Sequence, residues 1–143
     1  MEETVIREGR AEDLAGVAAV QAESPEAPAW RVEEYLAYQL DVAERGGEIV
    51  GFLVTRRLVE GEAEVLNVAV ALRARRQGVA RRLLRLAMGR WPGEWYLEVR
   101  ESNAGARACY QQLGFREAGR RPGYYASGNE NSAEVGIVME WHR

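Results

Sequence analysis

The spacing of apolar residues predicts two helices and a set of antiparallel strands in the first half of the chain. In the first helix, Leu14, Val17 and Gln21 recur every three or four positions, which is the period of a helix. A double glycine at 46–47 separates two apolar runs, as the turn of a β-hairpin does. The expected elements are a strand at 4–8, helices at 12–22 and 32–40, and strands at 40–45, 48–58 and 63–70.

The second half of the chain alternates helices with strands. The nearly continuous apolar run at 95–99 predicts a strand buried on both faces, and the order strand, helix, strand implies parallel pairing. The expected elements are a basic loop at 71–78, a helix at 79–90, a strand at 95–99, a helix at 103–113, and strands from 115 and at 135–141. We therefore expect one mixed α/β domain over residues 1–143, with a mostly antiparallel N-terminal sheet that continues into a parallel strand pair flanked by helices.

Composition is typical of a compact globular protein. With 143 residues, 47% of them apolar, the chain is long enough to bury a core. The single cysteine, Cys109, excludes a disulfide scaffold, and we interpret it as a packed thiol. No run approaches the roughly 18 to 20 apolar residues of a membrane span, and the N-terminus lacks the apolar stretch of a signal peptide, so the expected location is cytoplasmic. His142 has no partner at metal-ligand spacing, and we expect it to be inert and no metal to be bound.

The charged residues are unevenly distributed. All 19 basic residues are arginine, against 22 Asp and Glu, which gives a formal net charge of −3. The stretch 65–93 contains no acid and carries +7, so the remaining 12 arginines and 22 acids give −10. Its arginines are Arg73, Arg75, Arg76, Arg81, Arg82, Arg85 and Arg90. Such asymmetry indicates a polyanionic ligand at this block, and a solvated helix face is the alternative interpretation.

The loop that leads into the basic helix has features of a phosphate site. Gly78 and Ala80 are small enough to let a pyrophosphate approach the backbone. The N-terminus of a helix presents free N–H groups and the positive end of the helix dipole. The segment lacks both the Gly-Lys-Ser/Thr ending of a Walker loop and the spacing of a GxGxxG fingerprint. A phosphate cradle and an ordinary basic turn therefore stay open as alternatives.

Several segments resemble a known family, the Gcn5-related N-acetyltransferases (GNAT). Motif A of that family, Gln/Arg-x-x-Gly-x-Gly/Ala, is similar to Asn67-Val68-Ala69-Val70 followed by Arg75-Arg76-Gln77-Gly78-Val79-Ala80. The second half more narrowly resembles the RimI group of ribosomal-protein-alanine N-acetyltransferases. The segments concerned are Leu97-Glu98-Val99-Arg100, Ser102-Asn103, Ala108-Cys109-Tyr110, Leu113-Gly114-Phe115 and Tyr124-Tyr125.

The resemblance implies that acetyl-CoA is the donor substrate. In the family, the strand that ends at Val70 splays from the strand at 95–99, and backbone groups of Val68 and Val70 hold the pantetheine in the opening. The phosphates would meet the loop amides, Arg76 and Arg81. The implied cofactor-binding residues are Val68, Ala69, Val70, Arg76, Gln77, Gly78, Val79, Ala80, Arg81 and Asn103. For Asn103, capping its own helix is an equally open interpretation.

The resemblance also implies the two groups that move protons. Glu98 matches the base that accepts a proton from the amine, directly or through water, and Tyr110 matches the acid that protonates the leaving thiolate. An ion pair with a nearby arginine is the alternative interpretation for Glu98. A core aromatic is the alternative for Tyr110.

The expected acceptor is the N-terminal α-amine of a ribosomal protein that begins with alanine, as the RimI group implies. An α-amine with a pKa of about 7.7 to 8.0 is partly neutral at pH 7, whereas a lysine amine near about 10.4 is almost wholly charged, so one modest base suits the α-amine better. The acceptor groove of the family corresponds to about 22–31 and 124–131. Acids in and next to these segments would attract a basic tail, and they are Glu23, Glu26, Glu33, Glu34 and Glu130. The chain departs from the RimI pattern on this side, at 24–30, 122–123 and 134–136.

Two other functions stay open. A GNAT enzyme could instead acetylate a small-molecule amine or a protein lysine. A non-catalytic protein could use the arginine block to bind nucleic acid, but such surfaces interleave aromatic residues, and none lies between Phe52 and Trp91. We therefore expect neither a nucleic acid nor a membrane as a direct partner.

Overall fold

Strand β4 (Glu62–Val70) belongs to two units of structure. The computed structural model describes residues 2–25, 30–59, 61–125 and 134–142. The first unit comprises residues 1–56 and 65–91, and the second comprises residues 57–64 and 92–143. Hydrogen bonding orders the strands β1-β2-β3-β4-β5-β7-β6 in a mixed sheet, which confirms the expected fold class. A single domain over residues 1–143 stays a prediction.

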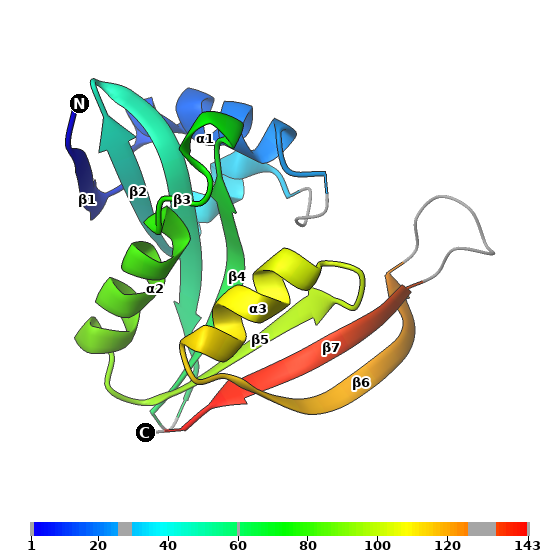
Figure 1. Ribbon diagram of the computed structural model, residues 1–143. Coiled ribbons are helices and arrows are strands. Elements are labelled where there is room, and N and C mark those ends of the chain that lie inside the picture. Colours follow the sequence, from blue (N-terminus) through cyan, green and yellow to red (C-terminus); the bar gives the residue numbers. More distant parts are fainter. Residues whose placement is uncertain (1, 26–29, 60, 126–133, 143) are drawn as a thin grey trace. The chain divides into compact units, whose positions relative to one another are not determined.

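The first unit has helices on both faces of its strands, α2 on one and α1 on the other (Figure 1). Strands β1, β2 and β3 pair antiparallel in that order, and β2 and β3 form the hairpin that the double glycine at 46–47 predicts. The elements are β1 (Thr4–Glu8), the 3-10 helix η1 (Ala11–Asp13), α1 (Leu14–Ala22), the 3-10 helix η2 (Val32–Ala37), β2 (Gln39–Arg45), β3 (Glu48–Arg57), β4 from Val65, the 3-10 helix η3 (Leu72–Ala74) and α2 (Val79–Arg90).

A β-bulge determines which helix each residue of β3 meets. The register with β2 shifts at Val50, the extra residue of the bulge, so Ile49 and Gly51 point to opposite faces. Ile49 packs on Gly16 of α1, where a Cβ atom would lie 2.7 Å from the isoleucine side chain. Gly51 meets Val79 at the start of α2, where a Cβ atom would lie 3.0 Å from the valine. Both helices therefore pack closely because glycine stands at the contact.

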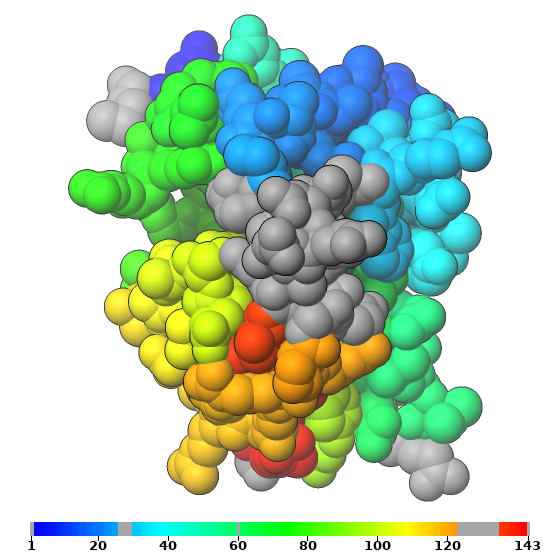
Figure 2. Space-filling view, turned by 90° about the vertical axis from the view of Figure 1, so that its right-hand side faces the viewer, coloured from blue at the N-terminus to red at the C-terminus, as the bar shows by residue number. Residues whose placement is uncertain are grey.

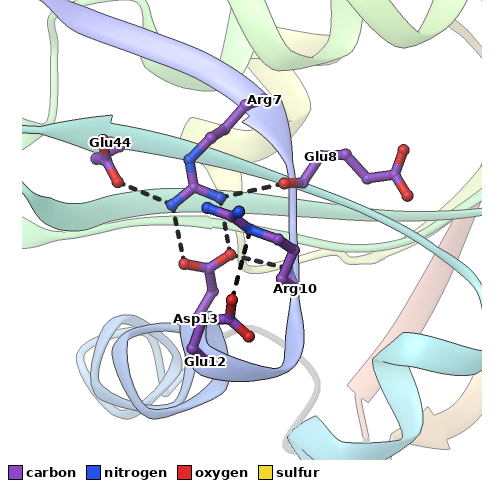
Figure 3. A network of polar contacts seen from close by, with 6 residues as sticks. All are labelled: Arg7, Glu8, Arg10, Glu12, Asp13 and Glu44. Atoms are coloured by element: carbon purple, nitrogen blue, oxygen red, sulfur yellow. Dashed lines mark hydrogen bonds and ion pairs between the residues drawn. The ribbon is translucent and has the colours of Figure 1, made fainter.

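A network of ion pairs joins β1, η1 and β2 (Figure 3). The guanidinium of Arg7 donates to both carboxylate oxygens of Asp13, at 2.8 and 2.9 Å, and to Glu44 at 2.8 Å. Asp13 also accepts from the backbone N–H of Arg10 at 2.8 Å. The hydrogen bond from Arg7 is the main reason that the pKa of Asp13 falls from 3.8 to about 2, and burial opposes that shift. This network fixes the start of the first helix to the sheet.

The second unit is a small sheet with one helix. Its elements are residues 62–64 of β4, β5 (Glu94–Arg100), α3 (Ala104–Gln112), β6 (Arg116–Tyr125) and β7 (Glu134–Trp141). Residues 62–64 pair with 94–96 in parallel, as the order strand, helix, strand predicts, and β7 pairs antiparallel with both β5 and β6. Gly114 ends α3 with a φ angle of 103°, which favours glycine.

Two expectations about the elements are wrong in detail. The helix expected at 32–40 is a 3-10 helix that ends at Ala37, because Gln39 already pairs in β2. Strand β5 is not buried on both faces, because its burial alternates and leaves Glu98 partly exposed. The buried residues of this strand are Trp95, Leu97 and Val99.

Within the described residues, no helix has the length and apolar composition needed to cross a membrane.

Candidate active site

The loop between β4 and α2 leaves the start of α2 open to a ligand. Arg76 and Gly78 have positive φ angles of 63° and 78°, which turn the chain sharply just before the helix. The first backbone hydrogen bond of α2 runs from the N–H of Arg82 to the carbonyl of Gly78, at 3.0 Å. The N–H groups of residues 79–81 precede this bond and point out of the helix end. Together with the helix dipole they suit an anion, as predicted for the motif A loop.

The seven arginines of the basic block divide into two groups. Four are held by protein groups: Arg73 by Glu48, Arg75 by Val70 and Ser24, Arg82 by the carbonyl of Thr4, and Arg90 by buried Asp41. Arg76, Arg81 and Arg85 form no hydrogen bond or ion pair with any residue that the structure describes. The charge available to a ligand is therefore smaller than the sequence total of +7 indicates, and two of its three carriers lie at the start of α2.

Among the predicted cofactor-binding residues of β4 and the loop, Gln77 and Val70 already have protein partners. The side chain of Gln77 accepts a hydrogen bond from Arg45 at 2.6 Å and donates to the carbonyl of Arg73 at 3.3 Å. The carbonyl of Val70 accepts a hydrogen bond from Nε of Arg75 at 3.0 Å. Backbone contacts of Val68, Ala69 and Val70 with pantetheine stay a prediction, and the structure adds that Arg75 already uses one of these carbonyl groups.

Glu98 lies on the partly exposed face of β5. Its side chain is 16% exposed and accepts a hydrogen bond from Nη1 of Arg121 at 3.1 Å. The alternative interpretation, an ion pair with a nearby arginine, therefore describes a contact that is present. A carboxylate held by a cation can still accept a proton from a substrate, so the role of base stays a prediction.

Tyr110 lies on α3 and is 6% exposed. Its ring packs against Phe115 with centroids 5.8 Å apart and an interplanar angle of 59°. The ring is thus part of the core of the second unit, as one interpretation expected. The role of its hydroxyl as an acid stays a prediction. The thiol of the preceding residue, Cys109, is partly exposed.

Asn103 caps α3. Its Oδ1 accepts a hydrogen bond from the backbone N–H of Ala106 at 3.3 Å, which is the contact expected of an N-cap. The capping interpretation is confirmed. Its Nδ2 makes no hydrogen bond to a residue that the structure describes, so pantetheine binding through this group stays a prediction.

The predicted acceptor groove lies partly outside the described residues. Glu26, Glu130 and the side chains of Tyr124 and Tyr125 belong to this undescribed part. Of the remaining acids, one has a defined partner in the basic loop: the carboxylate of Glu23 accepts a hydrogen bond from the N–H of Leu72 at 3.0 Å. The acidic groove stays a prediction.

His142, which we expected to be inert, contacts two carboxylates. It lies between Glu94, 3.1 Å from Nδ1, and Glu140, 3.0 Å from Nε2. These two carboxylates, Glu140 first, raise the pKa of His142. The sequence did not indicate this contact because the two acids come from different strands. Among the described residues, no group of three or more His, Cys, Asp and Glu could hold a metal ion.

A buried polar cluster that the first unit contains was not predicted from the sequence. Nδ2 of Asn67 donates to the hydroxyl of Tyr35 at 2.9 Å and to Oε1 of Gln21 at 3.3 Å, and the Tyr35 hydroxyl also donates to Gln21. Asn67 is 3% exposed and Tyr35 is fully buried. The available signal was one polar residue on the buried side of β4, whose other members are Ala63, Val65 and Ala69.

Comparison with known proteins identifies the family of the chain. Residues 9–115 match the model of the Acetyltransferase (GNAT) family. The ribosomal protein bS18-alanine N-acetyltransferase of Escherichia coli strain K12 is 39% identical over 111 residues, which are 75% of this chain and 71% of the relative.

Solved structures show the same fold. The ribosomal-protein-S18-alanine N-acetyltransferase from Escherichia coli matches with a TM-score of 0.83 at 28% identity, over 98% of this chain and 94% of that chain. Arabidopsis thaliana NAA60, solved in complex with acetyl-CoA, matches with a TM-score of 0.83 at 16% identity, over 98% of each chain, which shows the fold alone. Since the family model covers most of its length, the chain belongs to the GNAT family of acetyltransferases.

Proposed function

We propose that this chain transfers the acetyl group of acetyl-CoA to the α-amine of a ribosomal protein that begins with alanine. The observation that carries the proposal is the open N-terminus of α2, where the free N–H groups of residues 79–81 lie beside Arg76 and Arg81. Neither arginine has a partner among the residues that the structure describes. The choice of acceptor is supported by the similarity to the bS18-alanine N-acetyltransferase of Escherichia coli, which is 39% identical to this chain.

Acetyl-CoA carries a pyrophosphate and a ribose phosphate, and the start of α2 supplies groups for both. The N–H groups of residues 79–81 would bind the pyrophosphate, and the guanidinium groups of Arg76 and Arg81 would neutralise the remaining charge. Backbone groups of residues 68–70 would hold the pantetheine and polarise the thioester carbonyl, with Nδ2 of Asn103 as a further donor. No metal takes part in the proposed reaction.

The transfer forms one bond and breaks one bond. The neutral amine attacks the thioester carbon, and the resulting tetrahedral intermediate expels the thiolate of CoA as its C–S bond breaks. Glu98 accepts the proton that the amine nitrogen loses, directly or through water. Tyr110 donates its hydroxyl proton to the thiolate sulfur. The products are an N-acetylated protein and free CoA.

The choice of an α-amine follows from how much neutral amine is present. At neutral pH roughly a tenth of an α-amine with a pKa near 7.7 to 8.0 is uncharged, but only a very small fraction of a lysine side chain is. A single carboxylate, Glu98, serves as the base, and one such group suits the more acidic ammonium group better. Because ribosomal proteins are made in the cytoplasm, that is the proposed site of action.

Steady-state release of CoA tests the proposal. The substrates are a basic peptide that begins with alanine, the same peptide with an acetylated N-terminus, and a free polyamine. We expect the first to give the highest kcat/KM and the blocked peptide to be inert. No CoA release from the first peptide would overturn the proposed acceptor. In a parallel thermal-shift measurement, acetyl-CoA should raise the melting temperature and RNA alone should not. If acetyl-CoA leaves the melting temperature unchanged, the donor site is wrong.

A further inference from the structure

Arg75 is the first residue of motif A, but its side chain is directed at protein groups. Nε donates to the carbonyl of Val70 at 3.0 Å. Nη2 donates to the carbonyl of Glu23 and to Oγ of Ser24, both at 3.0 Å. Ser24 is only 4% exposed, so its hydroxyl is buried against the guanidinium. Arg75 thus ties the last residue of β4 to the chain that follows α1.

A second bond strengthens this tie from the other side. The N–H of Leu72 donates to the carboxylate of Glu23 at 3.0 Å. Figure 2 shows the surface where the end of α1, in blue, adjoins the basic loop, in green. The first residues of the loop are therefore held through the backbone N–H of Leu72 and the side chain of Arg75. Arg76 and Gly78, which have positive φ angles, follow directly.

This arrangement matters because the loop has to be in place before it binds an anion. Free N–H groups bind a phosphate well only when they are already oriented toward it, and a disordered loop would lose entropy on binding. We propose that Arg75 is a positioning residue for acetyl-CoA, which fixes the basic loop through Val70 and Ser24 and makes no contact with the phosphates. The inference rests on the proposed function, since it assigns acetyl-CoA to this loop.

The alternative role, a direct charge contact with a phosphate, predicts different behaviour in three variants. Arg75→Ala removes both the charge and the hydrogen bonds. Arg75→Gln removes the charge but keeps a donor, and glutamine is an accepted residue at this position of the motif. Ser24→Ala removes one acceptor of Arg75 and no charge. A positioning role predicts that Ser24→Ala weakens CoA binding and that Arg75→Gln largely preserves it. A direct phosphate contact predicts the opposite result for both variants.

The test measures the dissociation constant of CoA by calorimetry, with KM for acetyl-CoA, kcat and the melting temperature of each variant. We expect Arg75→Ala to weaken CoA binding about tenfold, since one or two hydrogen bonds to a charged group are lost. Ser24→Ala should weaken it by less, and the double variant should be no worse than Arg75→Ala alone. Arg75→Gln should restore most of the affinity. Since the role lies in donor binding, kcat at saturating acetyl-CoA should be almost unchanged.

Two control variants separate positioning from general effects. Arg85→Ala removes an equal charge from an arginine further along α2 that has no partner in the described part of the chain, and it should leave CoA binding nearly unchanged. Asp41→Asn weakens a buried ion pair of the same unit, with Arg90 at the far end of α2, and should do the same.

Two results together would overturn the inference and make Arg75 a phosphate ligand. Arg75→Gln would bind CoA as poorly as Arg75→Ala, and Ser24→Ala would bind CoA as well as the wild type. Wild-type binding by Arg75→Ala would also overturn it. If the wild-type protein itself fails to bind CoA, the proposed function fails as well. Wild-type binding of CoA without peptide turnover would contradict the proposed acceptor but leave the calorimetric test of Arg75 intact.

Discussion

Nη1 of Arg121 lies 3.1 Å from Oε1 of Glu98, and the two residues come from strands on either side of β7. The carboxylate proposed as the base is therefore already paired with a cation before any substrate is bound. An ion pair in a strand and a proton acceptor in a reaction are compatible roles for the same group, and substitution of Glu98 separates them.

Glu98→Gln should lower kcat by about 100-fold, because general acid-base groups typically contribute that much or more, while acetyl-CoA binds as before. The measurement is steady-state kinetics together with CoA calorimetry. Glu101→Gln is the matched control, since Glu101 is a more exposed carboxylate that also pairs with an arginine, Arg120. If Glu98→Gln has the kcat of the wild type, Glu98 is not the base and its role is limited to the ion pair with Arg121.

Tyr110→Phe removes the hydroxyl but keeps the ring that packs on Phe115. We expect kcat to fall at least tenfold, with little change in KM for either substrate, because the leaving thiolate loses its proton donor. Tyr96→Phe is the control, because the hydroxyl of Tyr96 donates to Glu94 at 3.0 Å and has no proposed role. Equal rates for Tyr110→Phe and the wild type would assign Tyr110 to the core only.

Arg76→Ala and Arg81→Ala should each raise the dissociation constant of CoA by about tenfold, the effect of losing one charge-assisted hydrogen bond to phosphate. Because the contact is electrostatic, part of this difference should disappear at high salt. Arg85 likewise pairs with none of the residues that the structure describes, but it lies one helical turn beyond Arg81, so Arg85→Ala should stay near the wild-type value. A larger effect at Arg85 would move the phosphate site along α2.

The pair of Arg7 and Asp13 predicts how stability depends on acid. The pKa of Asp13 is about 2 in the folded protein against an ordinary 3.8, so folding favours the ionised form. Above pH 3.8 this stabilisation is complete, and it amounts to about 2 kcal/mol. As the pH falls toward 2, the unfolded chain takes up the proton first and the stabilisation is lost.

Thermal unfolding between pH 7 and pH 2 measures this effect. Asp13→Asn should melt at a lower temperature than the wild type at pH 7, and the difference should shrink below pH 3.8. Glu12→Gln is the control, since Glu12 is a well-exposed neighbour whose contact with Arg10 is 3.8 Å. A difference between Asp13→Asn and wild type that is constant with pH would show that the carboxylate charge is not what stabilises the fold.

The elements with strong local patterns could be predicted from the sequence. The helix at 79–90 was predicted with both of its ends, because apolar residues at helical spacing alternate with arginines. The hairpin was predicted from Gly46 and Gly47, which both have positive φ angles. The length of the short helix η2 was overestimated, because its periodicity does not show that Gln39 belongs to a strand. Strand pairing depends on residues far along the chain.

Within the candidate site, the residues of the loop could be predicted but their partners could not. The sequence shows seven arginines without acids, but it does not show that Glu48, Asp41 and Ser24 fold back onto three of them. For the same reason the sequence indicates Glu98 but does not specify Arg121 as its partner. Contacts between distant segments are set by the register of the strands, which a single sequence does not show.

The most direct measurement of the central claim locates the acetyl group on a substrate with two kinds of amine. A basic peptide that begins with alanine and contains one internal lysine is incubated with acetyl-CoA and the protein, and the product is sequenced by tandem mass spectrometry. The chain contains no lysine and offers no lysine side chain of its own as a competing acceptor. We predict a single acetyl group on the α-amine of the alanine. Acetylation of the lysine side chain instead, or no acetylation at all, would contradict the account.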